Sequence, residues 1–223
     1  MSSASLHAKL RVVRALSTAL LLLVASRADA QFGAPPRSSD ASWWLSVDRG
    51  STRAAAFSDK LSNGTWELEK STSYGAALDY GRRDRTIGVA VSHATVPMLF
   101  QGTPCTGCAG QVTLTQLLAT YRMAGPLGNS GLTQIADLAI GASRWSELKG
   151  RDGNTLPPIK PVLNFTWVAG IGLGLPLGEN AEASIRYEVA QVRHARRELE
   201  QSGSGSVGMA TFRAGIRLRL GRQ

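Results

Sequence analysis

The chain alternates apolar and polar residues with a period of two over much of its length after residue 41. This period is typical of β-strands that have two different faces. The segment 210–220 shows it most clearly, with Phe212 and Ile216 on one face and Arg213 and Arg217 on the other. A helix would scatter these side chains around its axis, so the pattern predicts a strand.

Eight segments follow this pattern, some more cleanly than others. They are Ser42–Gly50, Trp66–Tyr80, Arg85–Val96, Val112–Arg122, Gln134–Trp145, Val162–Leu175, Glu182–Arg193 and Ala210–Leu220. In the fourth segment the alternation changes phase near Leu117 and Leu118, which predicts a β-bulge there. The sequence therefore predicts an all-β protein of about eight strands.

The connections between these segments are alternately long and short. The long ones are about 53–64, 97–111, 146–161 and 194–208, and the short ones are 81–84, 125–130 and 176–180. Short turns at one end and long loops at the other are typical of a transmembrane β-barrel with its turns in the periplasm. A soluble up-and-down barrel has no reason to separate its loops by length. We therefore predict an eight-stranded antiparallel up-and-down transmembrane β-barrel.

The composition of the two faces indicates which one meets lipid. One face is bulky and almost free of charge, as lipid requires, whereas the other consists of small residues with scattered charges of both signs. We expect the charged residues to form an ionic network in a crowded lumen, because buried charges need partners. They are Glu67, Glu69, Asp79, Asp137, Arg186, Glu188, Arg213, Arg217 and Arg219.

Aromatic residues and one lysine mark where the membrane boundaries should lie. Aromatic side chains collect at both membrane interfaces of such barrels. Those near the predicted strand ends are Trp43, Trp66, Tyr80, Tyr121, Trp145, Phe165 and Trp167. Lys70 shares the outward parity of Tyr74 and Leu78. A span of about 9–11 residues is enough, so Thr72–Tyr80 can cross while Lys70 stands above the bilayer.

The first thirty residues have the organisation of a cleaved secretory signal peptide. Lys9, Arg11 and Arg14 precede an apolar stretch over 15–25, and Ala28–Ala30 forms a small-x-small cleavage site. We expect residues 1–30 to be removed, 31–41 to form a short periplasmic lead, and 42–223 to form the barrel.

The chain has 25 basic and 16 acidic residues, but its arginines alternate with apolar residues, which argues against a nucleic-acid surface.

The candidates for chemistry are few. In an exported protein Cys105 and Cys108 are expected to form a small loop disulfide, and neither a second Cys pair nor a His cluster completes a metal site. The mature chain would keep only His93 and His194 as histidines, and the position two after His93 is Thr95 where a serine would be expected. We therefore expect no enzyme, and no catalytic, cofactor-binding or metal-binding residue.

Together, the signal peptide, the eight strands, the four long loops and the closing strand Thr211–Leu220 resemble the small outer-membrane β-barrels of diderm bacteria, the OmpA-type and OmpW-type group. The resemblance covers Ser42–Leu220, although the chain ends in Gly221–Gln223 and not in the aromatic residue usual for this group. It implies an outer-membrane location, with outer-membrane lipid, lipopolysaccharide and the barrel-assembly machinery as partners.

Three functions are compatible with this resemblance. The first is a structural or surface-interaction barrel with a filled lumen, whose long loops bind a ligand that the sequence does not identify. The second is a narrow channel for small or hydrophobic solutes, as in OmpW-type proteins, which the small residues of the polar face favour. The third, which the histidines disfavour, is a lipid-modifying enzyme. The charged run 193–200 is either a solvated loop or a contact to anionic lipid.

Overall fold

A computed structural model describes residues 41–59, 64–102, 106–146, 149–150, 162–193 and 206–220. The expected signal peptide (1–30) and all of the lead except Ala41 lie outside these ranges. The described part of the chain contains no helix that is both long and apolar enough to cross a membrane.

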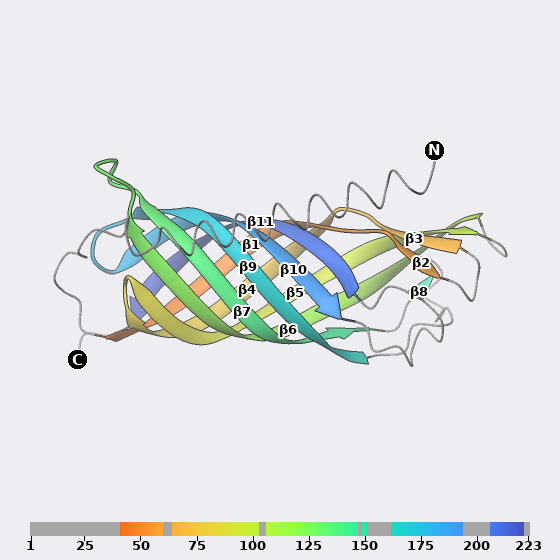
Figure 1. The fold of residues 1–223 in the computed structure, drawn as a ribbon, viewed down its shortest axis with the longest axis horizontal. Coiled ribbons are helices and arrows are strands. Elements are labelled where there is room, and N and C mark those ends of the chain that lie inside the picture. Colours follow the sequence, from red (N-terminus) through yellow and green to blue (C-terminus); the bar gives the residue numbers. More distant parts are fainter. Residues whose placement is uncertain are drawn as a thin grey trace. The chain divides into compact units, whose positions relative to one another are not determined.

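Eight antiparallel strands form a closed barrel, which confirms the predicted fold class (Figure 1). They are β1 (Ser42–Ala54), β4 (Ser71–Arg82), β5 (Arg85–Gly102), β6 (Thr106–Pro126), β7 (Thr133–Trp145), β9 (Val162–Pro176), β10 (Ala181–Arg193) and β11 (Ser206–Leu220). Each strand pairs with its neighbour in the chain, and β1 pairs with β11 to close the ring. Three short strands, β2 (Phe57–Asp59), β3 (Gly64–Leu68) and β8 (Lys149–Gly150), extend the ends of β5 and β6.

The strand register fixes the shape of the barrel. One row of directly paired residues runs once around the ring and returns to β9 ten residues from its start: Leu173, Ile185, Ala214, Arg49, Tyr74, His93, Thr115, Arg144 and Leu163. With a rise of ~3.3 Å per residue and a strand spacing of ~4.8 Å, this offset tilts the strands by about 41°. Each residue then advances ~2.5 Å along the barrel axis, and side chains can fill the interior.

The two faces of the strands alternate as the sequence predicted. On β1 the side chains of Trp43, Leu45 and Val47 are exposed on the outer surface, whereas those of Trp44 and Ser46 are buried inside. The same alternation recurs on the other barrel strands. Bulky apolar side chains therefore cover the outside of the barrel, where a membrane barrel meets lipid.

The short connections all lie at one end, together with the start of β1 and the end of β11. They are the turns 83–84, 127–132 and 177–180. Gly128 and Gly178 have φ values of 54° and 80°, in the left-handed region that favours glycine. We call this end the turn end and the opposite one the loop end.

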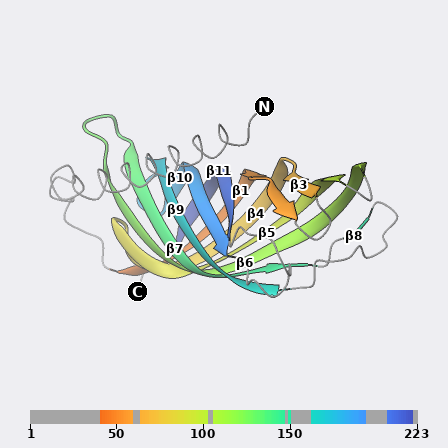
Figure 2. The same cartoon turned by 45° about the vertical axis from the view of Figure 1, so that its right-hand side comes forward.

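The predicted long loop 97–111 is wrong. The structure continues β5 to Gly102 and begins β6 at Thr106, so that most of this segment forms a paired hairpin beyond the other strands (Figure 2). The period-two alternation persists there, since Val96, Met98 and Phe100 are all buried. The predicted strand ends at Val96, but the backbone of Pro97 still takes part in pairing, because its carbonyl accepts a hydrogen bond from the backbone N–H of Glu69.

The predicted bulge near Leu117 and Leu118 is also wrong. Leu117 is exposed and Leu118 is buried, in phase with the rest of β6. The apparent change of phase arose because Leu118 is an apolar residue that faces the lumen. The register of the β5–β6 pair shifts instead between Phe100 and Gln101, near the tip of the hairpin.

The predicted strand Trp66–Tyr80 is divided at Glu69 and Lys70. Leu68 lies opposite Met98 and Ser73 lies opposite Ala94, so five steps on one strand match four on β5. This extra residue reverses the alternation, with the result that Leu68 packs against the buried apolar side chains. Lys70 is exposed and precedes β4.

Substitution by arginine at two outward positions of β5 tests which part of the surface is in lipid. Val89 is exposed in the centre of the apolar band, and Thr95 lies on the same face ~15 Å nearer the loop end. We expect Val89→Arg to lower the free energy of unfolding in lipid vesicles by about 2–4 kcal/mol and Thr95→Arg by less than about 1 kcal/mol. Equal losses in urea titrations would contradict the assignment.

Candidate functional site

The lumen contains three layers of side chains, of which the layer at the loop end is apolar. Its members come from five barrel strands and pack against one another: Ala94, Val96, Met98, Phe100, Val112, Leu114, Trp145, Val192, Val207 and Met209. Val96, Met98, Val112 and Val192 are each no more than 1% exposed. We call this group the apolar cluster. It fills much of the loop end of the lumen with packed apolar side chains.

Uncharged polar side chains form the next layer. Ser92 donates to Gln116, Gln116 donates to Ser143, and Ser143 hydrogen-bonds Thr166, in a chain that crosses β5, β6, β7 and β9. Across the lumen Thr52 pairs with Ser73 and Thr211. These bonds satisfy polar groups that the barrel has removed from bulk water.

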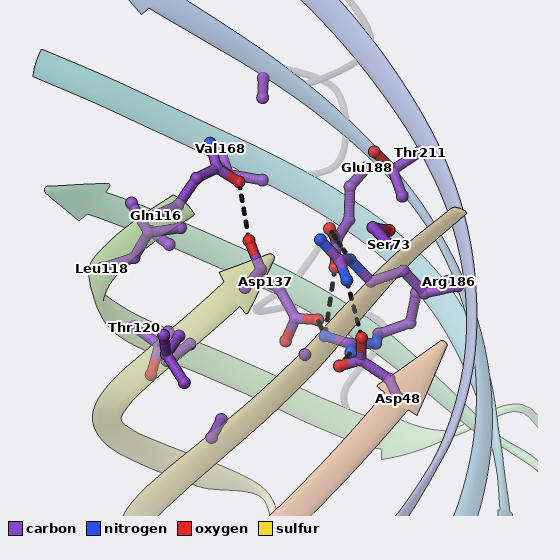
Figure 3. Close-up of a pocket in the computed structure, with 18 of the residues that line it drawn as sticks. Asp48, Ser73, Gln116, Leu118, Thr120, Asp137, Val168, Arg186, Glu188 and Thr211 are labelled. Atoms are coloured by element: carbon purple, nitrogen blue, oxygen red, sulfur yellow. Dashed lines mark hydrogen bonds and ion pairs between the residues drawn. The ribbon is translucent and has the colours of Figure 1, made fainter. Parts of the chain in front are cut away.

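A network of charged side chains occupies the middle of the lumen. Arg186 on β10 reaches Asp48 and Asp137 at 2.9 Å each and Glu188 at 3.3 Å. Arg213 on the neighbouring β11 reaches Asp48 at 2.7 Å and Glu188 at 2.6 Å. Figure 3 shows Arg186 close to Asp48 and Glu188, with Gln116, Leu118 and Thr120 on the far side of the cavity. Two arginines thus share their carboxylate partners, which crosslinks four strands.

The network continues toward the turn end with longer contacts. Arg122 pairs with Asp137 at 2.9 Å and approaches Glu182 at 3.8 Å. Glu182 is 1% exposed, and neither of its carboxylate oxygens has a hydrogen-bond partner. Arg83 lies 3.9 Å from it. These gaps are too long for direct hydrogen bonds, so the packing is looser here than around Arg186.

Arg217 fills the turn end of the lumen. Its guanidinium lies over the buried ring of Trp44 at 4.6 Å and donates to the Thr86 hydroxyl at 2.9 Å. Asp79 is its carboxylate neighbour at 3.8 Å, and Asp79 in turn accepts from Thr120 at 3.0 Å. Cation–π stacking therefore supplies part of the stabilisation that an ion pair gives elsewhere in the lumen.

The charges of the network balance within the described part of the chain. Five arginines meet five carboxylates: Arg83, Arg122, Arg186, Arg213 and Arg217, with Asp48, Asp79, Asp137, Glu182 and Glu188. Each of these ten side chains lies within 4 Å of at least one opposite charge. A buried charge without such a partner would cost several kcal/mol, so the balance is a condition for folding.

The structure brings six of the nine sequence-predicted network residues together. These are Asp79, Asp137, Arg186, Glu188, Arg213 and Arg217. Glu67 and Glu69 do not belong, because the extra residue at 69–70 turns both outward, where they are exposed. Arg219 lies at the turn end and donates to the Ser42 hydroxyl at 2.8 Å, without an ion pair among the described residues.

Sequence reasoning missed Asp48, Arg122 and Glu182 as members of the network. All three have inward parity on their strands, so the alternation itself was the signal that could have found them. Asp48 is the most important omission, because it pairs with both Arg186 and Arg213. Its strand position opposite Gly75 and Gly215 gives its side chain room to enter the lumen.

A small cavity lies beside the network in the middle of the lumen. Its volume is about 90 Å³, and small residues of β4 and β5 form much of one wall. Gly75 leaves room for Asp48 there, since a Cβ at this position would lie 2.6 Å from a carboxylate oxygen of Asp48, which would have to shift. A cavity needs roughly 10–15 Å³ for each water centre, so several waters fit, and Ala94, Leu114 and Met209 of the apolar cluster are among the residues that line it.

The other candidate residues lie away from the lumen or outside the described ranges. His93 is exposed on the outer surface, 3.2 Å from the Thr115 hydroxyl. Cys105 and His194 are outside the described residues, so the expected disulfide is untested. The prediction that Trp145 lies at a membrane interface is wrong, because its side chain is buried in the apolar cluster. Among the described residues no group of three or more acidic, His or Cys side chains is placed to hold a metal ion.

Comparisons with known proteins identify the fold. No protein-family model and no curated protein sequence matches the chain. The crystal structure of Neisserial surface protein A matches with a TM-score of 0.56 at 12% identity, covering 82% of this chain and 100% of that one. The outer membrane protein OprG from Pseudomonas aeruginosa matches with a TM-score of 0.53 at 12% identity, covering 83% and 99%. The chain has the fold of a small eight-stranded outer-membrane β-barrel.

Replacing Arg186 tests the energetic role of the network. Arg186→Met leaves Asp48, Asp137 and Glu188 with one cation fewer, so we expect the free energy of unfolding to fall by about 3–5 kcal/mol. Arg219→Met is the matched control, with an expected loss of about 1 kcal/mol for one hydrogen bond. Urea unfolding in vesicles measures both. Similar losses would show that the network is not the source of the stability.

Proposed function

We propose that this chain is an integral outer-membrane protein with a closed lumen, and that its long loops at the loop end contact a partner outside the cell. The fold, the bulky apolar outer surface and the separation of short turns from long loops support this proposal. A cleaved signal peptide over residues 1–30 would export the chain, and the barrel-assembly machinery would insert it.

The filling of the lumen is the observation that carries this proposal. A solute entering from the loop end meets the apolar cluster first, in which Val96, Met98 and Val112 are buried against one another. Beyond it Arg186 and Arg213 are tied to carboxylates on several strands. Opening a path would require both layers to be rearranged, whereas binding through the loops requires neither. Loops on a rigid scaffold are the usual place for recognition.

The proposal predicts a folded barrel that does not conduct ions. Unboiled protein from isolated outer membranes should migrate differently in SDS gels from boiled protein, because the closed barrel resists SDS until it is heated. The same preparation should give no discrete conductance steps in planar bilayers. Recovery in the soluble periplasmic fraction without a mobility shift would contradict the membrane location, and regular conductance steps would contradict the closed lumen.

A narrow channel for small or hydrophobic solutes is the second candidate. The apolar cluster favours it, because it lines the loop end with the side chains that a hydrophobic solute prefers, and the cavity of about 90 Å³ lies next to it. An enzymatic role has less support. His93 faces outward beside Thr115, and none of the described acidic residues forms an ion pair with it.

Truncating side chains of the apolar cluster distinguishes the closed barrel from the channel. We expect proteoliposomes of the wild-type barrel to take up a small apolar dye no faster than protein-free vesicles. Met98→Ala combined with Val112→Ala removes buried side chains from the cluster and should leave this rate unchanged if the ionic network also closes the lumen. Faster uptake by wild-type vesicles, increased further by the double variant, would instead support the channel.

A further inference from the structure

Arg49 stands on the membrane-facing surface at a depth where lipid tails are expected. It has the outward parity of Trp43 and Val47 on β1 and is exposed. Six residues separate it from Trp43 at the turn end, which places its Cα ~15 Å along the barrel axis. The apolar band of such barrels is ~25 Å tall. Arg49 therefore begins ~10 Å below the outer boundary, where an arginine facing lipid is costly.

The other outward charges of the loop-end half lie higher. Arg144 belongs to the same row of paired residues, but the row climbs by ~3 Å per strand, which places Arg144 ~12 Å above Arg49. Lys70 precedes β4 and is higher still than Tyr74, the direct partner of Arg49. Within the described spans Arg49 is thus the charge set deepest among apolar neighbours.

The surface around Arg49 offers a polar route from this depth to the outer boundary. A groove of about 380 Å³ runs along the outside of β1, β4 and β11, lined by Arg49, Ser51, Lys70, Thr72 and Phe212. The guanidinium of Arg49 lies 5.8 Å from the ring centre of Tyr74. Tyr74 is on the neighbouring strand β4, where the row of paired residues lies ~3 Å nearer the outer boundary. The groove therefore has a cation at each end and hydroxyl groups between them, and no acidic residue lines it.

A second, apolar groove begins at Arg49 and runs toward the turn end. Its volume is about 770 Å³, and it lies over β1, β9, β10 and β11. Val47, Ile185 and Ile216 line it together with the small residues Ala183 and Ala214. The two grooves share Arg49 and Ala214. A cationic, hydroxyl-rich groove thus continues into an apolar one, in the direction from boundary to membrane centre.

We propose that these grooves bind a phosphate-bearing lipid of the outer leaflet, such as lipopolysaccharide, with its phosphate groups in the polar groove between Arg49 and Lys70 and an acyl chain in the apolar groove. This site rests on the proposed membrane location and adds a specific contact to it. Arginine suits a phosphate because its planar guanidinium donates two parallel hydrogen bonds. The site also accounts for the depth of Arg49, because a bound phosphate compensates its charge on a face from which the neighbouring Asp48 turns away to pair with Arg186 and Arg213.

The test compares lipid retention by three forms of the barrel. Each is folded into phosphatidylcholine vesicles that contain lipid A at low molar fraction, extracted into mild detergent, and analysed by native mass spectrometry. We expect Arg49→Leu to reduce the bound lipid A about tenfold, since it removes charge-assisted hydrogen bonds. Arg144→Leu, an exposed arginine on β7 across the barrel, is the matched control and should retain the wild-type level. Arg49→Lys should retain an intermediate amount.

Each outcome decides for or against the site. Equal retention by Arg49→Leu and wild type, or equal losses in both leucine variants, would overturn it. Loss of a dimer in the Arg49→Leu spectrum, without loss of lipid A, would show that a second copy of the chain covers Arg49. Repeating the measurement with phosphatidylglycerol separates a requirement for lipid A from a preference for any lipid phosphate. A barrel that shifts on heating but fails this test would refute the site and leave the proposed function intact.

Discussion

The closure of the backbone hydrogen-bond ladder is the constraint on which the rest of the structure depends. In hydrocarbon every N–H and C=O must bond within the protein, so a spanning sheet has no free edge. Here the β1–β11 pairing closes the ring, from Trp43 opposite Leu220 to Ala54 opposite Met209. Eight strands with an offset of ten residues then fix the tilt and the radius. The lumen that results is narrow enough for side chains to fill.

A narrow lumen explains why its charges are matched so closely. Asp48 and Glu188 each pair with both Arg186 and Arg213, because β1, β10 and β11 bring the paired atoms to within 3.3 Å. Such sharing crosslinks the ring as well as neutralising it. Toward the turn end Glu182 has only distant arginines, and Arg217 relies partly on Trp44. The lumen is therefore most rigidly held at mid-height and loosest near the periplasmic end of the proposed orientation.

Periodicity predicted the eight strands because lipid forces an unbroken alternation on any strand that crosses it. The period-two pattern gave wrong predictions where a strand no longer has one face in lipid and one in the charged lumen. Near the loop end Met98 and Val112 are apolar on the inward face, so the pattern of a charged lumen does not extend to their hairpin and the sequence predicts a loop there. One inserted residue near Glu69 reversed the parity of Glu67, which single-strand patterns cannot reveal. Partners such as Asp48 with Arg213 depend on register between strands distant in sequence, and register is a property of the folded ring.

The same residue type meets opposite conditions on the two faces of one barrel. Arg213 points inward, where carboxylates on neighbouring strands neutralise it before the protein meets any ligand. Arg49 lies one residue from Asp48 and points outward, where the alternation of the strand prevents that carboxylate from reaching it. Its charge must therefore be compensated by the stacking of Tyr74, by reaching the boundary, or by an anion from the membrane. An outward arginine at this depth makes the stability of the barrel depend on the lipid around it, whereas the inward network makes its interior independent of that lipid.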